Sequence, residues 1–149
     1  MSPLPATVWD RVHEVRAALL RTIEELSPSG WSFVFTNVLS KGVAADREIV
    51  ERVRLLAESR NSQYAPVRLA CRTEELLRRV DRPERSARHK WVDPDGVRAF
   101  VENSEVIDIT HPHLLDIDVS QMAAHDAATL ILDHIDDWRS PERAEGSDR

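Results

Sequence analysis

The chain has 149 residues, which suits one domain of ordinary size. Hydrophobic residues make up 42% and charged residues 31%, a balance that excludes an intrinsically disordered chain. The formal net charge of −6 disfavours general binding to nucleic acid or to anionic membrane, so any anion site must be local.

The first half of the sequence predicts two helices with a strand between them. Residues 7–26 carry apolar side chains at steps of three and four, which indicates an amphipathic helix with Thr7 as its N-cap. Trp31–Val38 is a short aromatic and β-branched run, typical of a strand buried on both faces. A second helix is expected near 45–60. The expected inward residues are Val8, Val12, Val15, Leu19, Ile23 and Leu26 in the first helix and Ile49, Val53 and Leu56 in the second.

The second half predicts two more strands, each followed by a helix. Residues 65–71 indicate a strand, and Thr73 is placed to cap a short helix after it. Asp93 followed by Pro94 is a helix-start signal. Residues 113–119 alternate in polarity like a strand, and Ser120 is expected to begin the last helix. The expected inward residues of the three helices are Leu76, Leu77 and Val80, then Val97, Phe100 and Val101, then Ala127, Leu130, Ile131, His134, Ile135 and Trp138.

These elements predict one layered α/β domain over residues 1–139 and a flexible polar tail over 140–149. Helices that alternate with single buried strands imply right-handed parallel crossovers. About three parallel strands flanked by helices are expected, which is few for this architecture because central strands need neighbours on both edges. The fold class is therefore an incomplete three-layer α/β fold.

The order of elements and several short strings together resemble the C-terminal two thirds of a small P-loop kinase. The branch in question contains gluconate, shikimate and adenylate kinases, and the likeness spans roughly residues 7–137. It rests on Phe33–Asn37 as the third strand of the family, Val67–Leu69 with Glu74–Val80 as the fourth strand and its helix, Arg79–Lys90 as the lid, and Leu115–Ser120 as the fifth strand before the closing helix.

The resemblance implies an enzyme that transfers the γ-phosphate of ATP, with Mg²⁺, to a small hydroxylated molecule. The GxxxxGK[ST] loop that would cradle the phosphates is absent from the sequence, whose four glycines are all more than ten residues apart. We therefore expect a truncated or remnant kinase-like protein that binds no cofactor and is inactive by itself. In the family the missing first strand lies between the third and the fourth. Either the first two strands here pair directly, or the sheet has a vacancy.

Candidate site residues follow from this reading. Guanidinium groups of a lid stabilise a phosphoryl group in transfer, which makes Arg79, Arg85 and Arg88 the candidate catalytic residues. Thr36 and Asn37 follow a predicted strand at the edge where α/β sheets bind ligands, and Arg16 lies on the polar side of the first helix. These three are the candidate substrate-binding residues.

Other patterns favour structural roles. In His111-Pro112-His113 the proline holds the segment extended and no third ligand is anchored nearby, so we expect a turn and no metal site. Asp116 and Asp118 share one side of their strand, in a family position that serves structure. Cys71 is interpreted as a small packed hydrophobe, and the four tryptophans as packing residues.

Two alternative functions stay open. One is a non-catalytic protein-interaction module in which another chain, or a second copy, covers the open sheet. The other is nucleic-acid binding through residues 78–90, where six basic residues face two acidic ones. No membrane segment is expected because no apolar run approaches the roughly 20 residues that a spanning helix needs. Residues 1–5 lack the features of a signal peptide, so a cytoplasmic location is predicted.

Overall fold

The structure, a computed structural model, describes residues 5–87 and 90–139. The chain is mixed α/β, and its described residues form six helices and a pair of parallel strands. Contacts divide it into two compact units, the first made of residues 1–64 and 104–108 and the second of 65–103 and 109–149. None of the helices in the described ranges combines the length and apolar character needed to cross a membrane.

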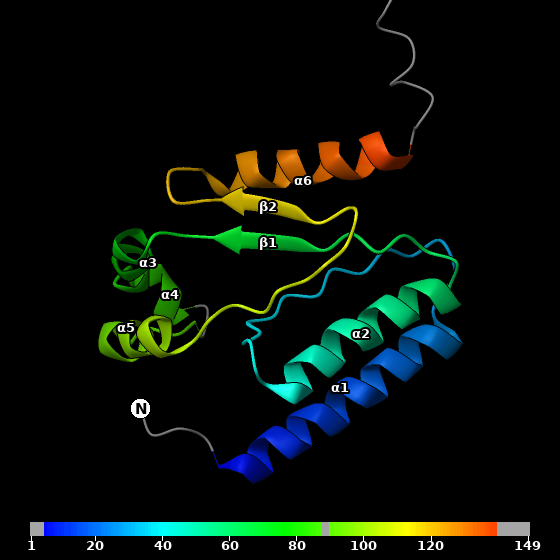
Figure 1. Cartoon of the computed structure of the whole chain (residues 1–149), viewed down its shortest axis with the longest axis horizontal. Helices are drawn as coiled ribbons and strands as arrows, with labels where there is room; N and C mark the ends of the chain where they lie inside the picture. The colour runs from blue at the N-terminus through cyan, green and yellow to red at the C-terminus, as the bar shows by residue number, and fades with distance from the viewer. Residues whose placement is uncertain (1–4, 88–89, 140–149) are drawn as a thin grey trace, which may run out of the picture. The chain divides into compact units, whose positions relative to one another are not determined.

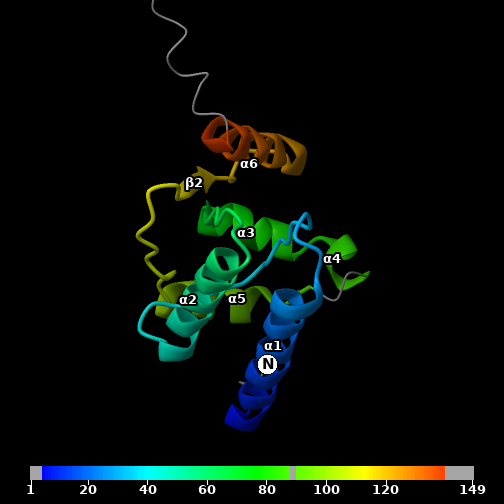
Figure 2. The same ribbon diagram turned by 90° about the vertical axis from the view of Figure 1, so that its right-hand side faces the viewer.

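The first unit is built on two helices, α1 (Ala6–Leu26) and α2 (Ala44–Ser59), which lie side by side in Figure 1 and Figure 2. Ile23 of α1 and both Ile49 and Leu56 of α2 are buried and belong to the core of this unit, whereas most of the inward residues predicted for α1 are exposed: Val8, Val15, Leu19 and Leu26. The helix predicted over 45–60 and its inward face are confirmed. Thr7 is not the N-cap of α1, because the helix begins one residue earlier and Pro5 holds that position.

Arg60, the residue after α2, closes the end of α1. Its guanidinium donates hydrogen bonds to the carbonyl oxygens of Ile23 at 2.7 Å, Ser27 at 3.1 Å and Pro28 at 2.8 Å. The carbonyl oxygens of Ile23 and Pro28 also accept the backbone N–H groups of Ser27 and Trp31, at 3.4 and 3.1 Å, so this side chain adds a second donor at the end of α1 and in the turn after it. It also lies over the ring of Phe33, 5.4 Å from its centroid.

The strand predicted over Trp31–Val38 is not formed. Residues 31–39 have no regular secondary structure, and Val34 and Val38 are 90% and 75% exposed. Aromatic side chains of this segment contact each other, with Phe33 and Phe35 stacked at 6.5 Å between ring centroids. Strand-like pairing in this unit occurs two residues after the predicted strand, as a single antiparallel bridge between Ser40 and Val106. A run of strand-forming residues becomes a strand only where a partner strand is available, and here the described chain supplies none.

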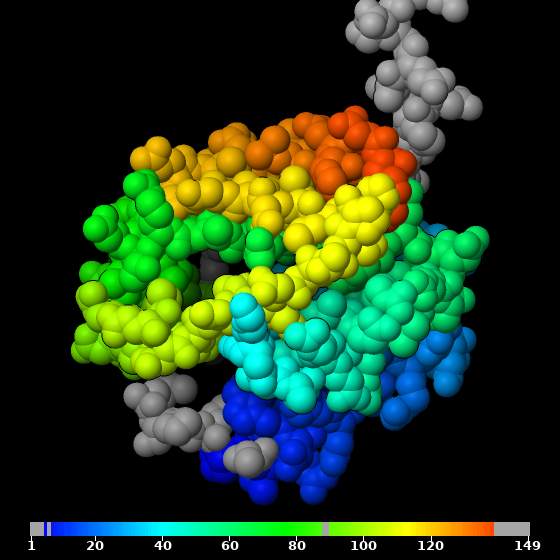
Figure 3. Space-filling view, in the orientation of Figure 1, coloured from blue at the N-terminus to red at the C-terminus, as the bar shows by residue number. Residues whose placement is uncertain are grey.

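The second unit contains the parallel pair β1 (Val67–Ala70) and β2 (Leu115–Asp118). In this pair Arg68 lies opposite Asp116, and the two side chains form a bidentate ion pair at 2.5 and 2.8 Å. Helix α6 (Ala124–Arg139) follows β2 and packs along it, as Figure 1 and Figure 3 both show. The predicted strands 65–71 and 113–119 are confirmed in a shorter form. The last helix begins at Ala124 and not at Ser120 as predicted.

Three short helices lie between β1 and β2 in the chain: α3 (Thr73–Val80), α4 (Pro83–Ala87) and α5 (Pro94–Asn103). Helices α3 and α5 pack together, and their Val80 and Val97 are the most buried residues of the group. The Asp93–Pro94 start signal is confirmed, since the Asp93 carboxylate accepts the backbone N–H of Gly96 at 3.1 Å. That hydrogen bond lowers the pKa of Asp93.

Candidate functional site

The carboxyl ends of β1 and β2 form the candidate site. Parallel strands end at the same edge of a sheet, and open α/β sheets bind their ligands at that edge. Here the edge carries Cys71 and Arg72 after β1, and Asp118 to Ser120 at the end of β2. Helix α3 begins directly after Arg72 and therefore contributes its own polar side chains to this edge.

Ser120 is the centre of the polar contacts at this edge and is only 6% exposed. Its Oγ accepts the backbone N–H of Arg72 at 2.7 Å and donates to Oδ1 of Asp118. The same carboxylate oxygen accepts the backbone N–H of Ser120 at 2.8 Å. These two hydrogen bonds, the side-chain one above all, lower the pKa of Asp118. The loops that leave the two strands are thus joined through one hydroxyl group.

Arg79 holds the same edge from helix α3. Its Nη2 donates to the carbonyl oxygens of Val119 at 2.6 Å and Ser120 at 3.5 Å, and its Nε donates to Glu75 at 2.7 Å. Glu75 also accepts a bidentate pair of hydrogen bonds from Arg78. The Arg78 hydrogen bond, and then that of Arg79, lowers the pKa of Glu75 to about 2. With its side chain 27% exposed, Arg79 is engaged with the protein's own carbonyl and carboxylate groups.

The other two predicted arginines lie further along the chain. Arg85 is in α4, and its Nε donates to the carbonyl oxygen of Trp91 at 3.2 Å. Arg88 lies outside the described residues. The structure therefore describes Arg79 and Arg85 on consecutive helices of the second unit, and the catalytic roles of all three arginines stay predictions.

The predicted substrate-binding residues belong to the first unit. Arg16 is half-buried in the middle of α1, whereas Thr36 and Asn37 are exposed in the irregular segment that replaces the predicted strand. The reason for assigning Thr36 and Asn37 to a sheet edge is therefore wrong, since no strand ends at them. Their role in binding stays a prediction.

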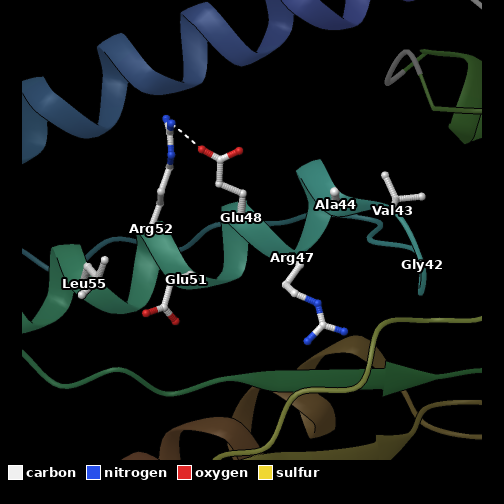
Figure 4. Close-up of a pocket in the computed structure, with 8 residues that line it drawn as sticks. All are labelled: Gly42, Val43, Ala44, Arg47, Glu48, Glu51, Arg52 and Leu55. Carbon is white, nitrogen blue, oxygen red and sulfur yellow. Dashed lines mark hydrogen bonds and ion pairs between the residues drawn. The ribbon is translucent and has the colours of Figure 1, made fainter.

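Figure 4 shows a second surface feature, an open hollow of about 600 Å³ on the N-terminal half of α2. Arg52 and Glu48 pair with each other at 2.6 Å on one side of the helix, and Arg47 points away from them on another. All of the lining comes from one helix and the turn before it, so the hollow gathers no chemistry from separate elements. It is lined by Gly42, Val43, Ala44, Arg47, Glu48, Glu51, Arg52 and Leu55.

The two histidines at 111 and 113 lie at a turn, as predicted. The backbone N–H of His113 donates to Nδ1 of His111 at 3.2 Å, and the His113 ring stacks on Trp138 at 3.8 Å. Nε2 of His134 lies 3.1 Å from the carbonyl oxygen of His113, which ties α6 to this turn. Within residues 5–87 and 90–139, no three metal-ligating side chains are grouped to hold an ion.

The sequence makes Arg79 a candidate site residue and gives Asp118 a structural role, but it does not reveal the role of Ser120. The pattern that could have found it is Asp-Val-Ser at a strand end, because an aspartate commonly accepts the backbone N–H two residues later in a turn. We assigned Ser120 to a helix start, where serine is equally common.

Comparison with known proteins adds no family: no family model, no curated protein and no solved structure matches this chain.

Proposed function

We propose that the chain is a non-catalytic α/β module of P-loop kinase-like type that works by binding another polypeptide at the free edge of β1. The observation that carries this proposal is the parallel strand pair itself, in which β1 has one strand neighbour, β2, among the described residues. An unpaired strand edge presents a row of backbone donors and acceptors that another extended segment can match.

The register identifies the free backbone edge. The carbonyl oxygens of Pro66 and Ala70 accept hydrogen bonds from Leu115 and Val119, at 3.0 and 2.8 Å. Backbone groups alternate in direction along a strand, so those of Val67 and Leu69 point to the opposite edge. The Leu69 side chain is 55% exposed, which adds apolar surface at the same position. An extended segment from a second copy or from a different protein offers the same complementary backbone.

The kinase resemblance supports the same edge. In that family the first strand lies between the third and the fourth, and residues 67–69 resemble the fourth. Since β2 takes one side of β1, the free side corresponds to the position of the first strand. A polypeptide that binds there would restore the neighbour that this sequence does not provide.

Catalysis by these 149 residues alone is not part of the proposal. The sequence has no glycine-rich phosphate loop, and Arg79 directs its N–H groups at the Val119 and Ser120 carbonyl oxygens and at Glu75. Calorimetric titration with ATP and Mg²⁺ should give no heat, and no ATP hydrolysis should be measurable. Tight, stoichiometric ATP binding would show that a phosphate cradle exists and would overturn this part of the proposal.

The binding role is tested by placing a charge at the free edge. We expect Leu69→Lys to reduce concentration-dependent association in sedimentation equilibrium, because a lysine on an edge strand opposes strand addition. Leu132→Glu is the matched control, since Leu132 is similarly exposed, at 61%, and lies on α6. Association that is equal in the wild type and Leu69→Lys would contradict a role for this edge.

A further inference from the structure

The exposed face of α1 carries an apolar stripe that α2 does not cover. Its members recur at alternating steps of four and three residues. The side chains of Val8, Val15, Leu19 and Leu26 are 36% to 76% exposed. This spacing is the seam of a two-stranded coiled coil. The stripe consists of Val8, Val12, Val15, Leu19, Thr22 and Leu26, of which Val12 alone is half-buried. The sequence predicted Val8, Val12, Val15, Leu19, Ile23 and Leu26 to face inward, and of these the structure buries only Ile23.

We propose that α1 pairs with α1 of a second copy of this chain in an antiparallel, two-fold symmetric arrangement. The stripe is symmetric about Ala17, so an antiparallel copy places Val8 against Leu26 and Val15 against Leu19. A two-fold interface uses the same surface on both subunits, and one helix therefore supplies both halves. At 21 residues, α1 spans three heptads and about 31 Å.

The charges beside the stripe favour pairing with a second copy of this chain in the antiparallel direction. Arg11, Ala18 and Glu25 recur every seven residues along one flank of the stripe. In an antiparallel pair this flank faces its own copy, so that Arg11 lies opposite Glu25 twice and the small Ala18 meets itself. In a parallel pair Arg11 would instead lie beside Arg16 twice, which places like charges together. Charge complementarity therefore favours the antiparallel dimer.

The opposite flank of the stripe carries Trp9, Arg16 and Ile23, and its contacts in the dimer are partly unfavourable. Arg16 meets its own copy at the two-fold axis, while Trp9 lies at each end of the pair and Ile23 stays buried in its own unit, at 4% exposed. Trp9 is 49% exposed and adds apolar area at each end of the pair. The single Arg16–Arg16 repulsion is outnumbered by the two attractions between Arg11 and Glu25. Arg11 pairs with Glu14 on the surface of the single helix, an exposed ion pair that is weak enough to be exchanged.

The first experiment measures molar mass against concentration by sedimentation equilibrium. Wild type should form dimers, and Leu19→Glu should raise the dimer dissociation constant at least about tenfold, because it places a charge in the centre of the seam. Leu19 is 52% exposed, so the substitution should leave the circular dichroism spectrum unchanged, and the unfolding midpoint should be unchanged at concentrations where both proteins are monomeric. Leu132→Glu on α6 is the control and should leave the dimer intact. Wild type that stays monomeric, or dimers that Leu19→Glu does not weaken, would overturn the proposal.

The second experiment tests direction with cysteines in a Cys71→Ser background. A short bismaleimide should link Arg11→Cys to Glu25→Cys when the two variants are mixed, and should link neither variant to itself. Self-linking of either one would indicate a parallel pair and contradict the antiparallel arrangement. Absence of linking in the mixture, at concentrations where sedimentation shows dimers, would likewise contradict it.

This inference is independent of the proposed function, because α1 and β1 belong to different units of the chain. Leu19→Glu should leave association through β1 unchanged, and Leu69→Lys should leave cross-linking through α1 unchanged. The failure of one proposal is therefore distinguishable from the failure of the other.

Discussion

At the scale of single residues, Ser120 shows how a buried hydroxyl group can join two strand ends. Removing its Oγ in Ser120→Ala leaves the Arg72 N–H without its acceptor in a part-buried position. We expect a loss of about 1–2 kcal/mol in the free energy of unfolding, measured in urea. The control is Ser62→Ala, whose exposed hydroxyl bonds the Arg60 carbonyl oxygen only at 3.4 Å and should cost almost nothing.

The same variant should change the titration of Asp118. Its folded pKa is lowered by Ser120, so the contribution of this carboxylate to stability is present above its ordinary pKa of 3.8 and is lost as the pH falls through the folded value. Ser120→Ala should return the pKa of Asp118 toward 3.8, as measured from its carboxyl carbon by NMR. An unchanged pKa of Asp118 in Ser120→Ala would mean that a group other than the Ser120 hydroxyl stabilises its carboxylate.

Glu75 provides a second test of the charges at the sheet edge. Its folded pKa of about 2 lies below the ordinary 4.5, so the stability it confers is complete above pH 4.5 and is lost as the pH falls through about 2. Because Arg78 supplies the largest effect, Arg78→Ala should raise the pKa of Glu75 more than Arg79→Ala does. The opposite order, read by NMR titration, would reject this assignment.

Arg79 distinguishes a structural role from a catalytic one. Arg79→Met removes hydrogen bonds to Val119, Ser120 and Glu75, and we expect it to lower the free energy of unfolding by about 1–3 kcal/mol. Arg82→Met, at an exposed position nearby, is the control. Unfolding free energies that are equal for Arg79→Met and wild type would show that the contacts of Arg79 do not hold the fold.

At the scale of elements, the end of α1 depends on Arg60, the residue after α2. Arg60→Ala should remove a donor from the Ile23 carbonyl and from the turn after α1, so that amide hydrogens in the final turn of α1 exchange faster while those in the middle of α2 are unchanged. Arg52→Ala removes an exposed pair with Glu48 and serves as the control. Equal exchange in all three proteins would contradict the role of Arg60.

The elements that sequence reasoning predicted correctly carry their own local signals. Helix α2 has a continuous apolar stripe, α5 has Asp93 followed by Pro94, and β2 alternates in polarity. Such signals lie within a few residues of the element and do not depend on which distant segment it packs against.

The elements that were mispredicted depend on distant partners. Trp31–Val38 has the composition of a strand, but a strand requires a neighbour with matching register, which composition does not specify. In the same way the spacing in α1 identifies an apolar stripe but not what covers it, so Val15 and Leu19 were expected inside and are exposed. The contacts of Ser120 and Arg79 also join segments about 40 or more residues apart, beyond the reach of local patterns.

At the scale of the whole molecule, the kinase resemblance makes a prediction about the gene. We expect the reading frame upstream of Met1 to encode a strand followed by GxxxxGK[ST] if the sequence is part of a longer enzyme. A nearby stop codon in that frame would favour the interaction module instead. The observation requires only the genomic sequence, and calorimetry with ATP and Mg²⁺ on the 149-residue chain provides an independent measurement.

The hydrogen bonds that Arg60 donates at the end of α1 also affect how the protein responds to acid. A guanidinium keeps its proton at every pH at which proteins are handled, and carbonyl oxygens do not titrate. Acid that discharges Asp118 and weakens the turn after β2 therefore leaves the junction of α1 and α2 unaltered. Acidification below pH 3.8 should loosen the strand ends of the second unit while the contacts of Arg60 with the end of α1 persist.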